Sequence, residues 1–162
     1  MLQGGVKLKK LLLFILAITL FLSGCSPKKV LSLNKKSDFE LIATCKQEDI
    51  KSEANIKCSG AIITVTYTYP KCLDGLTFIF DGDLGTVKYM GLEIKEENLN
   101  ILKSTCPEVI AKSLQDSISK FDKEINGSTE YGNYNIKIDE STGVPSTLNV
   151  PNKKLNCTFK LK

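Results

Sequence analysis

This 162-residue chain contains six cysteines, whose thiols could act as nucleophiles, bind metals or form disulfides. The chain has no histidine, and all 22 of its basic residues are lysine. The sequence therefore excludes Ser-His-Asp and Cys-His nucleophilic catalysis, zinc sites that use histidine, and bidentate arginine clamps on phosphate. We predict that the protein is not an enzyme and carries no cofactor.

Five of the cysteines lie beyond residue 37: Cys45, Cys58, Cys72, Cys106 and Cys157. Their closest spacings are 13 and 14 residues, whereas structural metal sites use local pairs such as Cys-x-x-Cys, so we predict no metal site. Outside the cytoplasm one or two disulfides are allowed, but the sequence leaves their pairing open. Cys45 and Cys157 fall on apolar faces of predicted strands, which is typical of small buried residues.

The N-terminal residues have the pattern of an export signal. Lys7, Lys9 and Lys10 precede an uncharged, largely apolar run at 11–22. This run is too short to cross a membrane, which takes about 20 residues, but it suits a signal peptide. It ends in Leu22-Ser23-Gly24-Cys25, which resembles the lipobox of bacterial lipoproteins in all four positions.

The lipobox resemblance implies that Cys25 is lipidated. In that family the thiol receives a diacylglyceryl group, the peptide before it is removed, and the cysteine becomes the mature N-terminus. The implied location is the extracytoplasmic face of the cell membrane, with the membrane as a partner through this anchor. Two acyl chains suit durable anchoring, because one chain alone binds marginally. The alternatives are an uncleaved anchor, or a secreted protein with a coincidental cysteine.

The positive charge of the chain lies at its N-terminal end. The formal net charge is +4, but residues 1–36 carry seven lysines and no acid, while residues 37–162 carry 15 lysines and 18 acids. Lysines directly after a lipid anchor favour an anionic bilayer surface. We predict three regions: a signal peptide at 1–24, the lipidated cysteine with a basic tether at 25–36, and one domain at 37–162. No nucleic-acid partner is expected.

Alternation of apolar and polar residues predicts seven strands in the domain. They cover 39–45, 61–69, 76–80, 87–89, 134–138, 148–150 and 155–159. Pro70 ends the second strand, and residues 81–85 form a hairpin turn. Asp81 and Asp83 in this turn could belong to a calcium loop, but the other ligands of such a loop are missing and we favour the turn.

One helix is indicated after Thr105. Thr105 is the predicted N-cap, with Pro107 in the first turn and Glu108 three residues after the cap, as in a capping box. Gly127 and the polar residues around it end the element. Cys106 lies at this N-terminus, where thiol pKa values fall, but without a base beside it we interpret it as structural. The predicted apolar stripe consists of Ile110, Leu114, Ile118 and Phe121.

The order of these elements predicts an α+β fold in which a curved antiparallel sheet of about seven strands packs on one main helix. The segments 132–139, 142–145 and 148–150 are similar to a strand-turn-strand motif of LolA-like lipoprotein carriers. The resemblance implies a half-barrel whose concave apolar face, closed by a helix, holds an acyl chain or another hydrophobe. LolA carriers themselves are soluble, so transport of lipoproteins is not implied.

Two functions remain open at this point. One is a membrane-anchored, non-catalytic binding module for a lipid or other hydrophobic ligand. The other is a structural or protein-interaction lipoprotein of the cell envelope whose apolar strand faces fill an ordinary core. An internal apolar cavity favours the first, and a tightly filled core favours the second.

Overall fold

The computed structural model describes residues 38–97, 102–120 and 122–162. The predicted signal peptide, Cys25, the basic tether and Phe121 lie outside the described residues.

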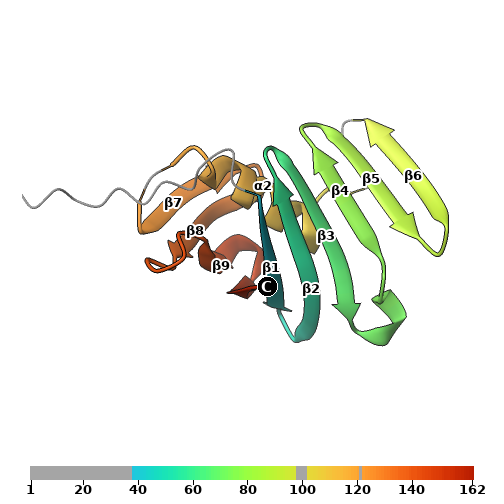
Figure 1. Ribbon diagram of the computed structural model, residues 1–162, viewed down its shortest axis with the longest axis horizontal. Coiled ribbons are helices and arrows are strands. Elements are labelled where there is room, and N and C mark those ends of the chain that lie inside the picture. The colour runs from blue at the N-terminus through green and yellow to red at the C-terminus, as the bar shows by residue number, and fades with distance from the viewer. Residues whose placement is uncertain (1–37, 98–101, 121) are drawn as a thin grey trace, which may run out of the picture. The chain divides into compact units, whose positions relative to one another are not determined.

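The described residues form one ten-stranded sheet (Figure 1). Its first six strands are β1 (Phe39–Gln47), β2 (Ile50–Ser59), β3 (Ile62–Tyr69), β4 (Thr77–Asp81), β5 (Leu84–Tyr89) and β6 (Leu92–Glu97). The helix α2 (Cys106–Ser117) follows. The last four strands are β7 (Glu124–Thr129), β8 (Gly132–Ile138), β9 (Pro145–Val150) and β10 (Leu155–Leu161). Two short 3-10 helices occupy Lys71–Leu73 and Pro151–Lys153.

The strand order is β6-β5-β4-β3-β2-β1-β10-β9-β8-β7, and each neighbouring pair is antiparallel. The first described strand, β1, lies in the middle of the sheet; the chain then runs outward through β6 and passes through α2 to the opposite edge. It then returns through four strands until β10 pairs with β1. This arrangement confirms the prediction of an antiparallel sheet with one main helix.

The predicted number of seven strands was wrong, because β2, β6 and β7 were not recognised. In β2 only Ala54, Ile56 and Cys58 are buried, and lysine, serine, glutamate and asparagine surround them. Leu92 and Ile94 of β6 are exposed, since β6 is an edge strand. These segments take their strand structure from pairing with neighbours, which a single-strand pattern reveals poorly.

The helix begins where the sequence predicted and ends earlier. Thr105 is its N-cap and Ile118 its C-cap. Gly127, which was expected to end this element, lies instead in β7, directly opposite Tyr134 of β8. A Cβ atom at Gly127 would overlap the Tyr134 ring, so the glycine makes room for the aromatic side chain.

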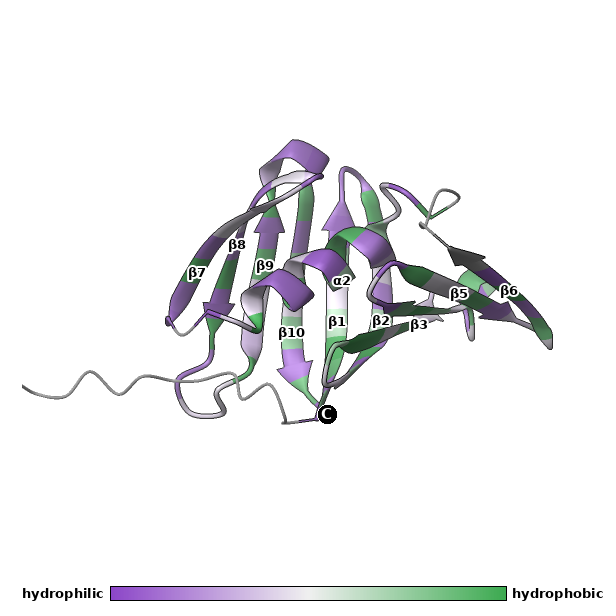
Figure 2. Cartoon of the chain, turned by 90° about the horizontal axis from the view of Figure 1, so that it is seen from above, coloured by the Kyte–Doolittle hydropathy of each residue, from purple (hydrophilic) through white to green (hydrophobic). Residues whose placement is uncertain are grey.

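The core lies between α2 and the face of the sheet that curves around it (Figure 2). Leu41 of β1, Ile63 of β3, and Ile110 and Leu114 of the helix are at most 1% exposed. Of the predicted apolar stripe, Ile110 and Leu114 are buried on α2, whereas Ile118 lies one residue beyond its last residue and is half-buried. These helix side chains pack against the concave face of the sheet. Other side chains of α2 lie at the margin of this core.

None of the helices in the described residues is long and apolar enough to span a membrane.

Candidate functional site

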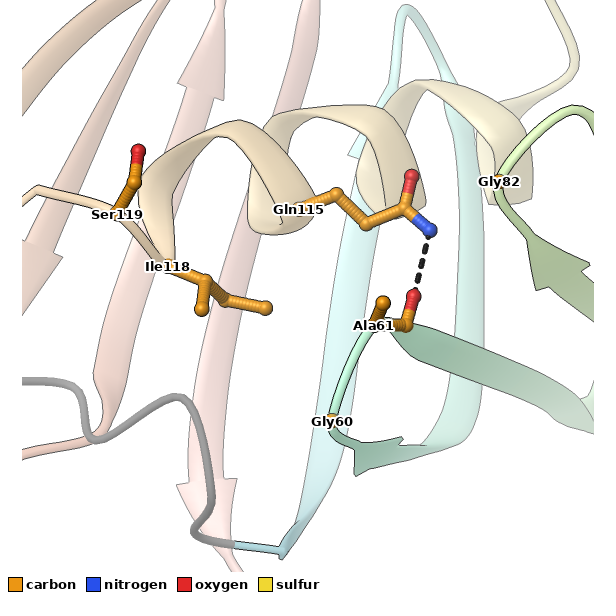
Figure 3. Close-up of a pocket in the computed structure, with 6 residues that line it drawn as sticks. All are labelled: Gly60, Ala61, Gly82, Gln115, Ile118 and Ser119. Carbon is orange, nitrogen blue, oxygen red and sulfur yellow. Dashed lines mark hydrogen bonds between the residues drawn. The ribbon is translucent and has the colours of Figure 1, made fainter.

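A groove of about 360 Å³ lies between α2 and two turns of the sheet (Figure 3). Its walls come from the β2–β3 turn, the β4–β5 turn, and the C-terminal half of α2 with the residues just after it. The lining residues are Gly60, Ala61, Gly82, Gln115, Ile118 and Ser119. Three of these six, Gly60, Ala61 and Gly82, have no side chain larger than a methyl group. They leave open the space between the turns and the helix that forms the groove.

Hydrogen bonds from the helix fix the width of the groove. The Nε2 amide of Gln115 donates to the carbonyl oxygen of Ala61 at 2.8 Å (Figure 3). One turn earlier on the helix, Nζ of Lys112 donates to the carbonyl oxygen of Gly82 at 3.2 Å and lies 3.5 Å from a carboxylate oxygen of Asp83. Both turns are thus tied to the same helix face, which leaves Ile118 as the large apolar side chain of the groove.

The groove lies at the margin of the core. The side chains between the helix and the centre of the sheet, such as Leu41 and Ile63, are fully buried. A ligand in the groove would therefore rest against Ile118 and the glycine-containing turns, while the packed core stays closed beneath it. The volume falls at the small end of the range for small-molecule pockets, roughly 300–1,000 Å³.

A second hollow of about 340 Å³ lies at the β5–β6 turn. Its lining includes Lys88 and Glu93, whose charged groups form an ion pair of 3.0 Å. The exposed charges make this hollow a poorer place for an apolar ligand than the groove beside α2.

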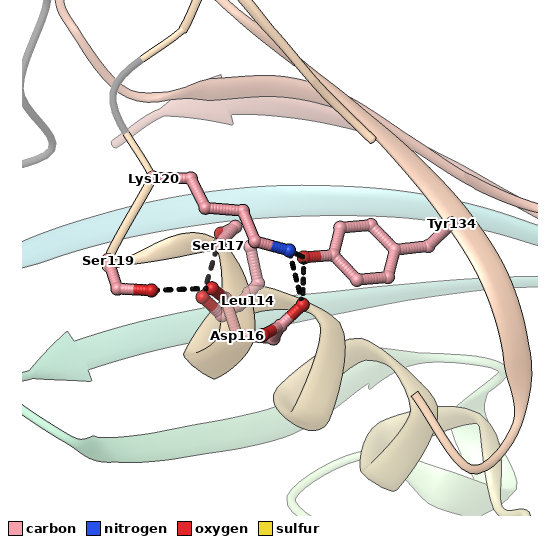
Figure 4. Close-up of polar contacts among 6 residues, drawn as sticks. All are labelled: Leu114, Asp116, Ser117, Ser119, Lys120 and Tyr134. Carbon is pink, nitrogen blue, oxygen red and sulfur yellow. Dashed lines mark hydrogen bonds and ion pairs between the residues drawn. The ribbon is translucent and has the colours of Figure 1, made fainter. Parts of the chain in front are cut away.

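A polar cluster fixes the C-terminal end of α2 to β8, next to the groove (Figure 4). Tyr134 donates its hydroxyl to Oδ2 of Asp116 at 2.5 Å, and Nζ of Lys120 lies 2.7 Å from the same oxygen. Nζ of Lys120 also donates to the Tyr134 hydroxyl at 3.1 Å. The three side chains satisfy one another and position the end of α2, where Ser119 borders the groove.

Protonation in this cluster is fixed at neutral pH. Partial burial works against the charge of Asp116, but hydrogen bonds from Lys120 and Tyr134 outweigh it and lower the pKa of the carboxyl. Burial, together with the hydrogen bond to Asp116, raises the pKa of Tyr134 to about 12. An ionised carboxylate beside a protonated phenol and a protonated amine is suited to holding structure, because none of the three groups titrates near neutrality.

Glu108 is a buried carboxyl at the other end of α2, with 1% of its surface exposed. Its Oε2 accepts a hydrogen bond of 2.8 Å from the backbone N–H of Ser104. The predicted capping box is not formed, because Glu108 bonds to the residue before the N-cap and the hydroxyl of Thr105 is buried and makes no hydrogen bond. Burial raises the pKa of Glu108.

The structure brings together three of the five cysteines that lie beyond residue 37. Cys45 of β1 is directly opposite Cys157 of β10, and both are buried as the sequence predicted. Cys106 approaches Cys45 from the helix. Cys58 is buried elsewhere, and Cys72 is exposed in the first 3-10 helix.

The expectation that a helix N-terminus lowers the pKa of Cys106 was wrong. Its interaction with Cys45 and its burial raise the pKa. The protonated thiol is therefore a weak nucleophile, which agrees with the structural role that we assigned to it.

The predicted turn at residues 81–85 is a hairpin connection whose two central residues are Gly82 and Asp83. Gly82 has a φ of 60°, which glycine adopts without strain. Within residues 38–97, 102–120 and 122–162, no three His, Cys, Asp or Glu side chains are grouped so that they could hold a metal ion.

Comparisons with known proteins place the chain in no established family. No protein-family profile matches it, and no curated protein matches it. In structure it is similar to an uncharacterized conserved protein from Thermus thermophilus, with 10% identity, a TM-score of 0.45, and coverage of 79% of this chain and 82% of that chain. It is also similar to a LolA superfamily protein from Nitrosomonas europaea, with 9% identity, a TM-score of 0.37, and coverage of 82% and 89%.

Proposed function

We propose that this protein is an extracytoplasmic lipoprotein, anchored to the cell membrane through a diacylglyceryl group on Cys25, whose domain binds one hydrophobic ligand without catalysis. The ligand class that we assign is an acyl chain or a similarly slender hydrophobe, held in the groove beside α2. In this proposal the sheet and the helix act as a LolA-like half-barrel, in keeping with the resemblance of residues 132–150 to that family.

The groove is the observation that carries the proposal. Its glycine and alanine walls and the Ile118 side chain offer apolar contacts, while its polar neighbours Gln115 and Lys112 are already engaged by backbone carbonyls. A ligand that enters it would gain burial of apolar surface and would not have to break the hydrogen bonds that hold the helix. An anchor upstream of the domain would keep this groove close to membrane lipid.

A titration with a fluorescent fatty acid tests the proposal. Ala61→Phe puts a large side chain into the groove and should weaken binding about tenfold or more, which corresponds to about 1.4 kcal/mol. Thr68→Phe is the matched control, because it adds the same side chain at an exposed position near the end of β3. Thr68→Phe should bind as the wild type does. Equal affinity in Ala61→Phe and wild type, or no binding by the wild type, would contradict the proposal.

The second candidate is a protein-interaction lipoprotein of the cell envelope. Edge strand β6 favours it, because Leu92 and Ile94 are 72% and 59% exposed on a strand whose outer edge pairs with no other strand of the described residues. The filled core beneath α2 also agrees with it. The fatty-acid titration separates the two candidates, since this one predicts that Ala61→Phe changes nothing.

A further inference from the structure

The first and last strands of the sheet bring two buried cysteines face to face. Cys45 of β1 and Cys157 of β10 are directly paired in the antiparallel register. They are 3% and 2% exposed, and their Sγ atoms lie 2.6 Å apart. Directly paired residues have Cα atoms roughly 4.5–5.5 Å apart, which falls within the range that disulfides span. The sulfurs can therefore bond without movement of either strand.

We propose that Cys45 and Cys157 form a disulfide that links β1 to β10 in the secreted protein. The oxidant is a disulfide, carried by a thiol oxidoreductase or a small molecule such as oxidised glutathione. The two S–H bonds break and one S–S bond forms between the cysteines. The S–S bond of the oxidant accepts the two electrons and both protons and becomes two thiols. The inference uses the oxidising compartment that the proposed export provides.

The surroundings of the other cysteines favour this pairing. Cys58 is opposite Phe39 and Ile63 in its two neighbouring strands, and its thiol lies 3.5 Å from the carbonyl oxygen of Gly60. Cys72 is exposed in the first 3-10 helix. Cys106 is the competitor, because it contacts Cys45 from the helix. It packs over the sheet, however, whereas Cys157 is held opposite Cys45 by the ladder of strand hydrogen bonds.

The disulfide would form before the core closes. In the folded domain the hydrogen bond with Cys106 lowers the pKa of the Cys45 thiol, but the interaction with Cys157 and burial outweigh it and raise the pKa, so little thiolate is present to react. In the unfolded chain the same thiols are accessible. Once formed, the bond is shielded from solvent by the core, and it closes a loop between residues that are 112 positions apart.

Peptide mapping tests the pairing. The full chain, isolated from an exporting bacterial host, is alkylated in denaturant without reductant, digested and analysed by mass spectrometry. We expect a Cys45 peptide joined to a Cys157 peptide, and alkylated Cys106. Two alkylated cysteines at 45 and 157, or a Cys45–Cys106 link, would overturn the inference. A second sample, reduced, unfolded and refolded with oxidised glutathione, should give the same link whether or not the chain is exported in its own cell.

Thermal melting provides an independent readout. Because the closed loop is long, reductant should lower the melting temperature of the oxidised wild type by roughly 10 °C or more. The Cys45→Ala/Cys157→Ala double variant should show no such dependence on reductant. Cys58→Ala and Cys106→Ala are matched controls. Each removes one thiol, and the melting temperature of each should still fall when reductant is added. A wild-type melting temperature that reductant leaves unchanged would overturn the inference.

Discussion

At the residue scale, two carboxyl groups on α2 respond to the fold in opposite ways. Glu108 is buried near the N-terminus of the helix, and its burial raises its pKa. Asp116 lies near the C-terminus, where hydrogen bonds from Lys120 and Tyr134 outweigh its partial burial and lower its pKa. The same helix therefore carries one carboxyl that destabilises the fold as it ionises and one that stabilises the fold in its ionised form.

The Glu108→Gln variant is predicted to gain stability relative to the wild type as the pH rises. A carboxyl with a raised pKa binds its proton more tightly in the folded state, so the wild type loses stability as the pH rises above the ordinary value of 4.5. Glutamine stays neutral and can still accept the Ser104 N–H. Urea unfolding at pH 4 and pH 7 should show the variant gaining stability relative to wild type at the higher pH.

Asp116→Asn is the comparison of opposite sign. The ionised Asp116 carboxylate stabilises the fold above pH 3.8, the ordinary pKa of the group, and this stabilisation is lost as the pH falls through its lowered pKa. Asp116→Asn should therefore be less stable than the wild type at neutral pH, and the difference should shrink in acid. Parallel pH trends in the two variants would contradict the assignment of the two environments.

Sequence patterns located these residues better than they described their contacts. The spacing of Thr105 and Glu108 correctly predicted the start of the helix. It did not predict that Glu108 would bond to Ser104 while the Thr105 hydroxyl stayed without a partner, because Ser104 adopts a φ of 65° just before the cap. Groove residues such as Ala61 and Gln115 carried no signal of their own, since their role depends on which turn comes to lie against which helix face.

At the element scale, the helix and the last strands are joined through Tyr134. Its ring lies across Gly127 of β7, and its hydroxyl reaches Asp116 of α2. A glycine in the middle of a strand would ordinarily weaken it, but here a larger residue would displace the ring that connects sheet and helix. The position of α2, and with it the groove, depends on this small residue.

Gly127→Ala is predicted to destabilise the domain by about 1–3 kcal/mol, because the new methyl group overlaps the buried Tyr134 ring. Ser128→Ala, at the exposed neighbouring position, should stay within about 0.5 kcal/mol of wild type. Denaturant unfolding of both variants provides the measurement. An alanine at 127 that unfolds like the Ser128 control would show that the ring does not need this space.

Strands with two-sided alternation were predictable, whereas strands specified by their neighbours were not. In β3, Ile63 and Val65 are buried and Thr64 is half-buried, which matches the pattern read from the sequence. β7 buries Ile125 and offers little other apolar signal, so its strand structure comes from pairing with β8. The helix ends at Ser117, and residues 118–123 connect it to this strand.

At the scale of the whole chain, the proposed N-terminal export signal and the folded domain differ in charge. The first 36 residues hold seven lysines and no acid, and the domain that follows is slightly acidic. The sequence could place Cys45 and Cys157 on apolar faces, but only the pairing of β1 with β10 in the middle of the sheet puts them opposite each other.

Cys25→Ala tests the proposed lipidation of Cys25. A chain without this thiol has no acceptor for the diacylglyceryl group, so its precursor should stay unlipidated and uncleaved by the lipoprotein peptidase. Metabolic labelling with a fatty acid and the intact mass of the product provide the measurement. Cys72→Ala, which removes an exposed cysteine of the domain, should be labelled as the wild type is. Unchanged labelling of Cys25→Ala would refute the lipobox assignment.

The most direct test of ligand binding is native mass spectrometry of the protein after enzymatic or chemical removal of the proposed lipid anchor. The groove beside α2 predicts one co-purifying lipid-sized ligand in the wild type and in Thr68→Phe, and a largely empty Ala61→Phe protein. Wild-type protein that stays consistently empty, or an Ala61→Phe variant that retains the same bound mass, would contradict a hydrophobic ligand in this groove.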